Sequence, residues 1–282
     1  MDYFDLHCDT ISKAFDKGAD IFDKSNAVNL KDISAFEHYI QTFAIFIKDD
    51  EPQPFTKYKK MLSFFRSQKE KLPKDLEYIL AVEGGAVLEN DIDRLYELKK
   101  DKIKLLSLAW NNGTDLAGGV YSDKSLTPVG EKAIAVMNEL KIACDLSHLN
   151  EKSFYKALEK SDKVLATHSN CFEVTPHKRN LKKAQISALA EKKGILGLCF
   201  YPDFLGEDIF EKIYKNIFLI ADMGFEDIIS IGSDFDGGVM DKQLDSTSKI
   251  PELYGFLGSK GLKKTLLDKI FYKNAYNFIA NF

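Results

Sequence analysis

Histidine and acidic residues follow five separate apolar runs of this sequence. The residues in this position are His7 and Asp9, Glu83, His148, His168, and Asp234. Imidazole and carboxylate groups without a thiolate suit a divalent metal such as Zn²⁺. The chain has only five histidines, and packing alone does not readily explain why three of them follow strand-like runs. The pattern therefore predicts a metal site.

The number and spacing of these groups favour two metals. His7 and Asp9 are two residues apart, so on an extended strand both side chains point the same way. Three histidines and two or three acids exceed what one zinc ion needs, and a pair of ions bridged by one carboxylate is a natural fit. We expect Glu83 to be the bridge, because it lies between the His7/Asp9 set and the His148/His168 set in strand order.

The apolar runs that precede these residues have the length of strands. They cover residues 2–7, 40–47, 77–82, 103–109, 141–147, 163–167, 194–200 and 227–232. Several are almost continuously apolar, which is typical of strands buried on both faces in a parallel sheet. Lys- and Glu-rich amphipathic stretches between them predict helices at 55–71, 91–100, 129–139, 151–160, 182–193 and 207–223. The tail, 259–282, predicts two further helices around Asn274.

Strands that alternate with helices in this way favour an α/β fold, a single (β/α)8 TIM barrel domain over residues 1–282 with C-terminal helices. In such a barrel all strands end at one face, where catalytic groups collect. A doubly wound open sheet is the alternative, but it would need a glycine-rich phosphate turn after the first strand, and HCDTISK is not one. Cap residues support the helix boundaries: Asn150 and Pro128 at helix starts, Gly194 and Gly224 at helix ends.

Composition excludes several functions. A formal net charge of −4 gives no field to attract phosphate backbones, so we expect no nucleic-acid partner. The N-terminus has no signal-peptide pattern, and no apolar stretch approaches the length that a membrane span needs, so we expect no membrane partner and a cytoplasmic location. The four cysteines are widely spaced, which predicts reduced thiols packed near strands.

The same residues lie in motifs that resemble those of the renal dipeptidase family, also called membrane dipeptidases, within the metal-dependent hydrolase barrels. The matching motifs are DLHCDT, VEGG, DLSH, THSNC, HKRNL, CFYPDFL and GSDFDGG, in family order over nearly the whole chain, with a looser match at KNAYNF. The resemblance implies a zinc dipeptidase with two Zn²⁺ per chain. Its substrates would be small dipeptides, including those with a D-residue at the C-terminal position, and a homodimer is one assembly the family forms.

The resemblance also implies how the metal ligands are divided. By it, His7 and Asp9 bind one metal, His148 and His168 bind the other, and Glu83 bridges both. A hydroxide between the two ions would then attack the scissile carbonyl, because bound metals acidify water enough to supply this nucleophile at neutral pH.

Two further residues gain roles from the resemblance. Asp234 matches the acid that carries a proton to the leaving amine. Arg179, one of three arginines, matches the residue that grips the substrate's C-terminal carboxylate, a task that suits a planar guanidinium. His177 and His38 carry no such role; we expect a loop-structuring residue and a surface residue, respectively.

One motif departs from the family pattern. Where well-known members have THxxN after the fourth strand, this chain reads LAWNNG, with Trp110 at the histidine position. That histidine is thought to stabilise charge on the substrate carbonyl oxygen, and losing one such donor costs about 10²–10³ in rate. Asn111 or Asn112 could donate instead, and Trp110 could form a wall for an apolar side chain. Two alternatives stay open: a metal-dependent amidohydrolase of N-acyl amino acids or lactones, and a catalytically weak metal-binding relative.

Overall fold

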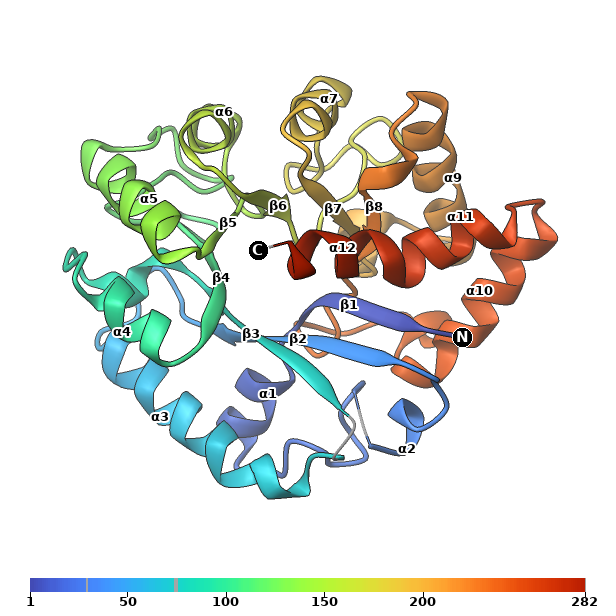
Figure 1. Cartoon of the computed structure of the whole chain (residues 1–282), viewed down its shortest axis with the longest axis horizontal. Coiled ribbons are helices and arrows are strands. Elements are labelled where there is room, and N and C mark those ends of the chain that lie inside the picture. Colours follow the sequence, from blue (N-terminus) through green and yellow to red (C-terminus); the bar gives the residue numbers. More distant parts are fainter. Residues whose placement is uncertain (29, 74–75, 282) are drawn as a thin grey trace.

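The eight predicted strands form a closed barrel in which each strand pairs with its neighbours in chain order. The computed structural model describes residues 1–28, 30–73 and 76–281. Neighbouring strands are parallel throughout (Figure 1). The strands are β1 (Tyr3–Cys8), β2 (Tyr39–Phe46), β3 (Glu77–Glu83), β4 (Ile103–Ser107), β5 (Ala143–Asp145), β6 (Val164–Ala166), β7 (Ile195–Leu198) and β8 (Ile229–Ile231). The (β/α)8 prediction is confirmed; the single-domain organisation over 1–282 stays a prediction.

The six helices predicted between the strands are present and surround the barrel (Figure 1). They are α3 (Pro54–Gln68), α4 (Arg94–Lys100), α5 (Pro128–Leu140), α6 (Glu151–Lys160), α7 (Lys183–Glu191) and α9 (Ile209–Asp222). Within the described residues, four further α-helices were not predicted. They are α1 (Thr10–Lys17), α2 (Leu30–Ile33), α8 (Pro202–Leu205) and α10 (Ile250–Ser259). Apart from α10, these are short segments, in which helical periodicity is difficult to detect.

Three of the four predicted cap residues have the expected geometry. The Asn150 side chain accepts a hydrogen bond from the Ser153 backbone N–H at 2.8 Å, at the start of α6. Pro128 occupies the first turn of α5. Gly224, just beyond α9, has a φ of 83°, a left-handed conformation that glycine adopts without steric cost.

The prediction that Gly194 caps α7 is wrong. The left-handed residue after this helix is Lys193, with a φ of 56°. Gly194 is needed for a different reason, because a Cβ there would lie 2.3 Å from the Leu189 side chain and 2.9 Å from the Val164 carbonyl oxygen. Close packing between α7 and β6, rather than chain reversal, therefore requires glycine at this position.

The two helices predicted around Asn274 in the C-terminal tail are present. Helix α11 (Lys264–Asp268), a π-helical turn (Lys269–Lys273) and α12 (Asn274–Ala280) follow one another without a break. Asn274 is the first residue of α12, and its side-chain amide donates to the backbone carbonyls of Glu226 and Ile229. The last residue of the predicted tail, 282, lies outside the described residues.

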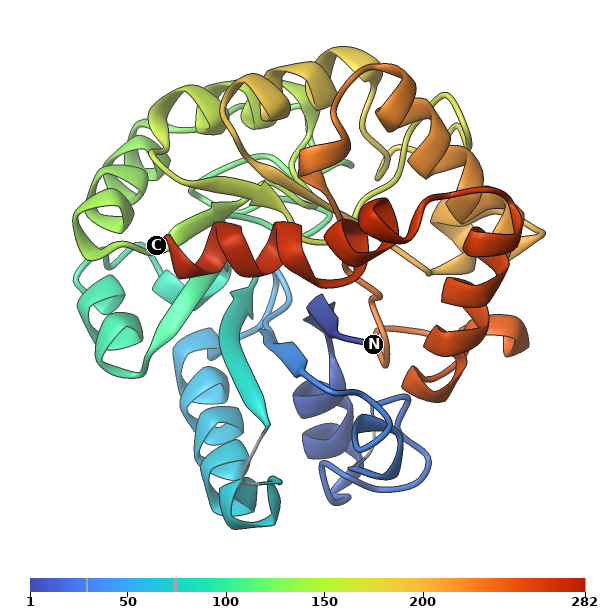
Figure 2. The same cartoon turned by 45° about the vertical axis from the view of Figure 1, so that its right-hand side comes forward.

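Helix α12 covers the amino-terminal end of the barrel, as the two overall views indicate (Figures 1 and 2). Ala275 and Phe278 of α12 join a buried apolar cluster with Phe4, Ile40 and other residues near the starts of the strands. The opposite end, where the strands finish, is left for the functional groups.

Strands β1 and β8 meet where the barrel closes. Their register contains one paired position, Asp5 opposite Ile231. Beyond it the two segments stay in contact, since the Asp234 N–H donates to the His7 carbonyl at 3.1 Å and the Asp9 N–H donates to the Phe235 carbonyl at 2.8 Å. This seam places the residues after β8 beside those at the end of β1.

All four cysteines are free and buried, as the sequence predicts. Cys8 is fully buried, and it contacts Thr10, whose hydroxyl lies 3.4 Å from the sulfur. The thiols are therefore part of the packed interior.

Candidate active site

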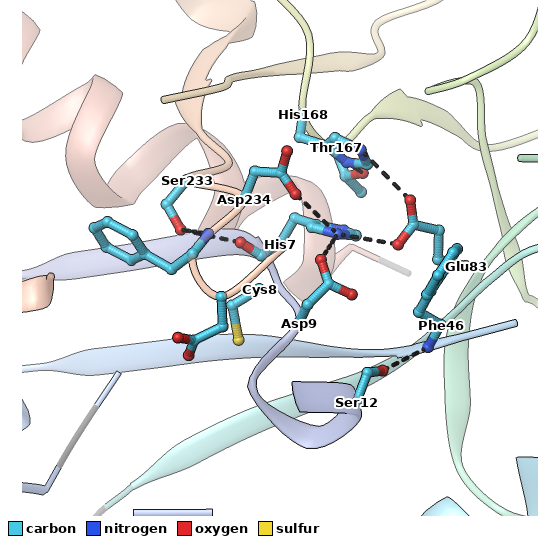
Figure 3. Close-up of polar contacts among 12 residues, drawn as sticks. His7, Cys8, Asp9, Ser12, Phe46, Glu83, Thr167, His168, Ser233 and Asp234 are labelled. Atoms are coloured by element: carbon cyan, nitrogen blue, oxygen red, sulfur yellow. Dashed lines mark hydrogen bonds and ion pairs between the residues drawn. The ribbon is translucent and has the colours of Figure 1, made fainter. Parts of the chain in front are cut away.

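The six predicted chemical side chains come together at the carboxyl ends of the strands, and all are buried. Five of them, all but His148, point toward one another in Figure 3. His7 belongs to β1, and Glu83 is the last residue of β3. Asp9, His148, His168 and Asp234 follow β1, β5, β6 and β8, respectively. Residues separated by more than 200 positions in the chain thus share one site because the barrel closes.

Glu83 lies at the centre of this cluster. Its Oε1 atom is 2.6 Å from His148 Nε2 and 3.7 Å from His168 Nε2, whereas its Oε2 atom is 3.4 Å from His7 Nε2. Each carboxylate oxygen therefore faces a different set of histidines. Figure 3 shows Glu83 between His7 and His168. This is the orientation that a bridging carboxylate requires.

The side of the cluster around His7 carries two more carboxylates. Asp9 Oδ2 lies 3.3 Å from His7 Nε2, and Asp234 Oδ1 lies 3.8 Å from the same atom. Asp9 Oδ1 is buried and has no hydrogen-bond partner among the described residues. Leaving a buried carboxylate oxygen unsatisfied is costly, and a cation would satisfy it.

The donor atoms are close enough to surround metal ions. Three overlapping groups each bring their ligand atoms within 4.8 Å of one another. They are His7 with Asp9 and Glu83, Glu83 with His148 and His168, and His7 with His168 and Asp234. All of the ligand atoms are nitrogen or carboxylate oxygen, which is the set that zinc accepts in catalytic sites. The residues present therefore fit a metal centre.

Local charges and burial set the protonation of the cluster. Burial, assisted by the charge of Arg179, lowers the pKa of His148 to about 4, which keeps its imidazole neutral as a metal ligand must be. Burial raises the pKa of Asp234 to about 7. Burial alone would raise the pKa of Glu83, but His7 and His148 outweigh it and hold that pKa well below its usual value.

Two site residues have backbones in the left-handed region although they are not glycine. His148 has a φ of 71° and Asp234 has a φ of 65°. Such conformations are uncommon for residues with a side chain, and at functional sites the surrounding structure maintains them. Here each follows a three-residue strand, so the chain turns sharply as it leaves the barrel and aims the side chain into the cluster.

Two residues that were not predicted from the sequence, Thr167 and Asp145, orient His168 through its Nδ1 atom. The Thr167 hydroxyl donates to Asp145 Oδ2 at 2.6 Å, and the same hydroxyl lies 2.8 Å from His168 Nδ1. This leaves Nε2 of His168 directed at Glu83. Outer contacts of this kind fix the tautomer and the ring orientation of a metal-binding histidine. Asp145 begins the DLSH motif and Thr167 begins the THSNC motif, so their place in these motifs could have indicated a role at the site.

A cavity of about 550 Å³ opens above the cluster. Trp110 and Asn111, both predicted to contact substrate, line it together with Glu83 and His148. The Trp110 ring packs edge-on against Phe46, with ring centroids 5.1 Å apart. One wall of the cavity is therefore aromatic. Asn111 also contacts the site itself, since its Oδ1 lies 2.9 Å from His148 Nδ1.

Arg179 is buried beside the cluster rather than in the wall of the main cavity. It lines an adjoining cavity of about 380 Å³ with His148 and His177. Its Nη2 donates to the His168 carbonyl at 3.2 Å, and its guanidinium lies 5.1 Å from the centre of the Phe204 ring. Its Nε has no partner in the described part of the chain. A buried guanidinium N–H without a partner is suited to donating a hydrogen bond to an anionic group of a ligand.

The remaining two histidines lie outside the cluster, although His177 lines both cavities. His177 Nδ1 accepts from the Arg179 backbone N–H at 3.2 Å, and its ring stacks on Phe204 at 4.8 Å, so it organises this loop. His38 is exposed and contacts Asp2.

A closed parallel barrel with buried imidazoles and carboxylates at the carboxyl ends of its strands defines the class of metal-dependent hydrolases. Residues 52–281 match the family model of the membrane dipeptidases, peptidase family M19, and the chain belongs to this family. It is thus a metallo-dipeptidase, a hydrolase of peptide bonds. In the described part of the chain, no helix combines the length and apolar character needed to cross a bilayer.

Individual proteins show the same similarity. The chain is 29% identical over 225 residues to a protein encoded in the pqqA 5′ region of Klebsiella pneumoniae, which covers 74% of this chain and 83% of that protein. It is 31% identical over 163 residues to a dipeptidase of Schizosaccharomyces pombe, which covers 55% of this chain but only 40% of the yeast protein.

Two solved structures superpose over 99% of the chain. The crystal structure of a family M19 metallopeptidase, dipeptidase AC, has a TM-score of 0.86, 25% identity and 98% of its own length covered. The structure of a metallopeptidase from Rhodobacter sphaeroides, liganded with a phosphinate mimic of the dipeptide L-Ala-D-Ala, has a TM-score of 0.88, 23% identity and 99% covered. At 23% identity, the similarity to the Rhodobacter sphaeroides protein shows that the two chains share a fold.

Proposed function

We propose that the chain is a binuclear zinc dipeptidase that hydrolyses dipeptides, including those with a D-residue at the C-terminal position. The observation that carries this proposal is the orientation of Glu83, whose two carboxylate oxygens face two different histidine sets. In this proposal His7 and Asp9 hold one ion, and His148 and His168 hold the other. The dipeptide mimic bound to the Rhodobacter sphaeroides relative supports the substrate class.

Two zinc ions bound here would acidify a water molecule, so that hydroxide is present at neutral pH to attack the peptide carbonyl. The protein's own groups perform the remaining tasks. Asp234, buried beside His7, takes the proton and delivers it to the leaving amine. Arg179 binds the free carboxylate of the substrate through its guanidinium. Trp110 forms the cavity wall where an apolar substrate side chain packs.

Metal content and turnover should be measured together on purified protein. We expect two zinc ions per chain, cleavage of L-L and L-D dipeptides, and loss of cleavage when a chelator removes the metal. Re-addition of zinc to the chelated protein is the control for irreversible damage. One ion or none per chain at saturating zinc would contradict the two-metal centre. Two ions without turnover on any dipeptide would instead favour a catalytically weak metal-binding relative.

Arg179 separates dipeptide hydrolysis from the alternative chemistry on lactones. We expect Arg179→Met to lower kcat/KM for a dipeptide by about 10–100-fold, because a hydrogen bond to a charged group contributes about 1.5–3 kcal/mol. Hydrolysis of a substrate without a carboxylate, such as the dipeptide amide or a lactone, should change little. The matched control is Arg66→Met, since Arg66 is an exposed arginine that pairs with Asp101, away from the cluster. Equal losses on both substrate types would argue against a carboxylate-binding role.

We also propose a cytoplasmic location and a homodimeric assembly. The cytoplasmic location rests on the sequence patterns described above, and a homodimer rests on the family resemblance alone.

A further inference from the structure

Asp49, outside the motifs that resemble the dipeptidases, holds the loop that follows β4. Its Oδ1 accepts a hydrogen bond from the Trp110 backbone N–H at 2.8 Å. Its Oδ2 accepts from the backbone N–H groups of Asn112, at 2.8 Å, and Gly113, at 3.1 Å. A carboxylate that receives three backbone hydrogen bonds fixes the path of that backbone. These charge-assisted bonds are among the stronger ones in proteins.

The other side of the same loop is closed by residues 119–121. The Tyr121 N–H donates to the Asn111 carbonyl at 2.8 Å. Gly119 approaches so closely that a Cβ there would lie 1.9 Å from the Trp110 carbonyl oxygen. The backbone of residues 110–113 is therefore held from both sides, and the contact from Asp49 is a charged one.

This loop delivers a side chain to the metal centre. Asn111 Oδ1 lies 2.9 Å from His148 Nδ1, and His148 Nε2 lies 2.6 Å from Glu83 Oε1. When Nδ1–H donates to an amide oxygen, Nε2 carries the lone pair that a metal needs. Asn111 therefore selects the tautomer of His148 that can serve as a ligand.

We propose that Asp49 is a positioning residue for the metal centre: through the backbone of residues 110–113 it places Asn111, which orients His148. The inference rests on the proposed function, because His148 is a ligand only in that proposal. The fluorescence of Trp110 reports on the conformation of this loop, because Trp110 is the only tryptophan of the chain.

Zinc affinity measured by competition with a chelator tests this role. In Asp49→Asn one oxygen is replaced by a donor that faces backbone N–H groups, so the loop should shift. We expect the affinity for one of the two zinc ions to fall about 10–100-fold, the usual effect of losing an outer contact of a metal ligand. The other ion should be unaffected. The matched control is Asp50→Asn, because Asp50 is the exposed neighbour of Asp49 and loses the same charge.

A double-mutant cycle separates positioning from general stability. If Asp49 acts through Asn111, Asn111→Ala should weaken the same ion, and the double variant should bind it no more weakly than the worse single variant. The Trp110 emission of metal-free Asp49→Asn should shift and become easier to quench with acrylamide, whereas that of Asp50→Asn should not change. Additive losses, or a lowered Tm with unchanged zinc affinity, would overturn the inference.

The same measurements distinguish failure of this inference from failure of the proposed function. Wild-type protein that binds fewer than two zinc ions would contradict the two-metal centre itself. The Trp110 emission of the metal-free proteins would then decide the role of Asp49, and an unchanged emission in Asp49→Asn would refute it.

Discussion

Replacement of Glu83 by Gln is expected to abolish stable binding of both zinc ions and, with it, dipeptide hydrolysis. The affinity for zinc should fall by more than about 100-fold, the upper range for losing an outer contact of a ligand, because Glu83 is proposed as a direct ligand of both ions. Glutamine keeps one oxygen, but it places an NH2 group toward either His7 or His148, where the carboxylate oxygens now lie 3.4 Å and 2.6 Å from the imidazole nitrogens.

Metal content by elemental analysis and turnover at fixed free zinc check this prediction. Glu89→Gln is a suitable control, because Glu89 lies close in sequence, is exposed and contacts Arg94 rather than the cluster. Far-UV circular dichroism should be the same for both variants if they fold. Two tightly bound ions in Glu83→Gln would refute the bridging role.

Replacement of Asp234 by Asn is expected to separate metal binding from catalysis. Turnover should fall about 10²–10⁴-fold, the contribution typical of a positioned acid–base group, while two zinc ions remain bound. The reason is geometric: Asp234 Oδ1 is 3.8 Å from His7 Nε2, farther than Asp9 Oδ2 at 3.3 Å, and Asp234 lines the substrate cavity. An amide there keeps the shape but cannot accept the proton.

The measurement is kcat with metal content determined on the same sample, with Asp245→Asn as the control at an exposed position beyond the same loop. Loss of one zinc ion from Asp234→Asn would show that this carboxylate is a ligand, in the group it forms with His7 and His168. Retention of most of the turnover would exclude the proton-transfer role.

The barrel and the core of the site could be predicted from sequence because their signals are local. Each strand is a short apolar run, and each proposed ligand stands within a few residues of the end of its run, as His168 does after KVLAT. A parallel barrel then brings these ends together without further information. Helix α1 was missed, since its eight residues leave little room for a helical period.

The outer contacts of the site could not be predicted, because they join distant segments. Asp49 and Trp110 are 61 positions apart, and Asp145 and Thr167 are 22 positions apart, with no spacing rule to connect them. Asn111 was expected to touch substrate, and its contact with His148 depends on the tertiary path of the loop. Gly194 illustrates the same limit, since close packing against Val164 and Leu189 is invisible in the sequence.

The seam between β1 and β8 links the proposed metal centre to folding. A single paired position, Asp5 opposite Ile231, joins the first strand to the last, and His7 reaches its partners only after the chain has closed into a ring. A ligand that binds the closed ring alone stabilises it by mass action, by about 2.7 kcal/mol at a free concentration of 100 Kd. Zinc shared between His7 and the later histidines would thus hold the first strand to the later ones, so that the concentration of free zinc would set the free energy of unfolding as well as the activity.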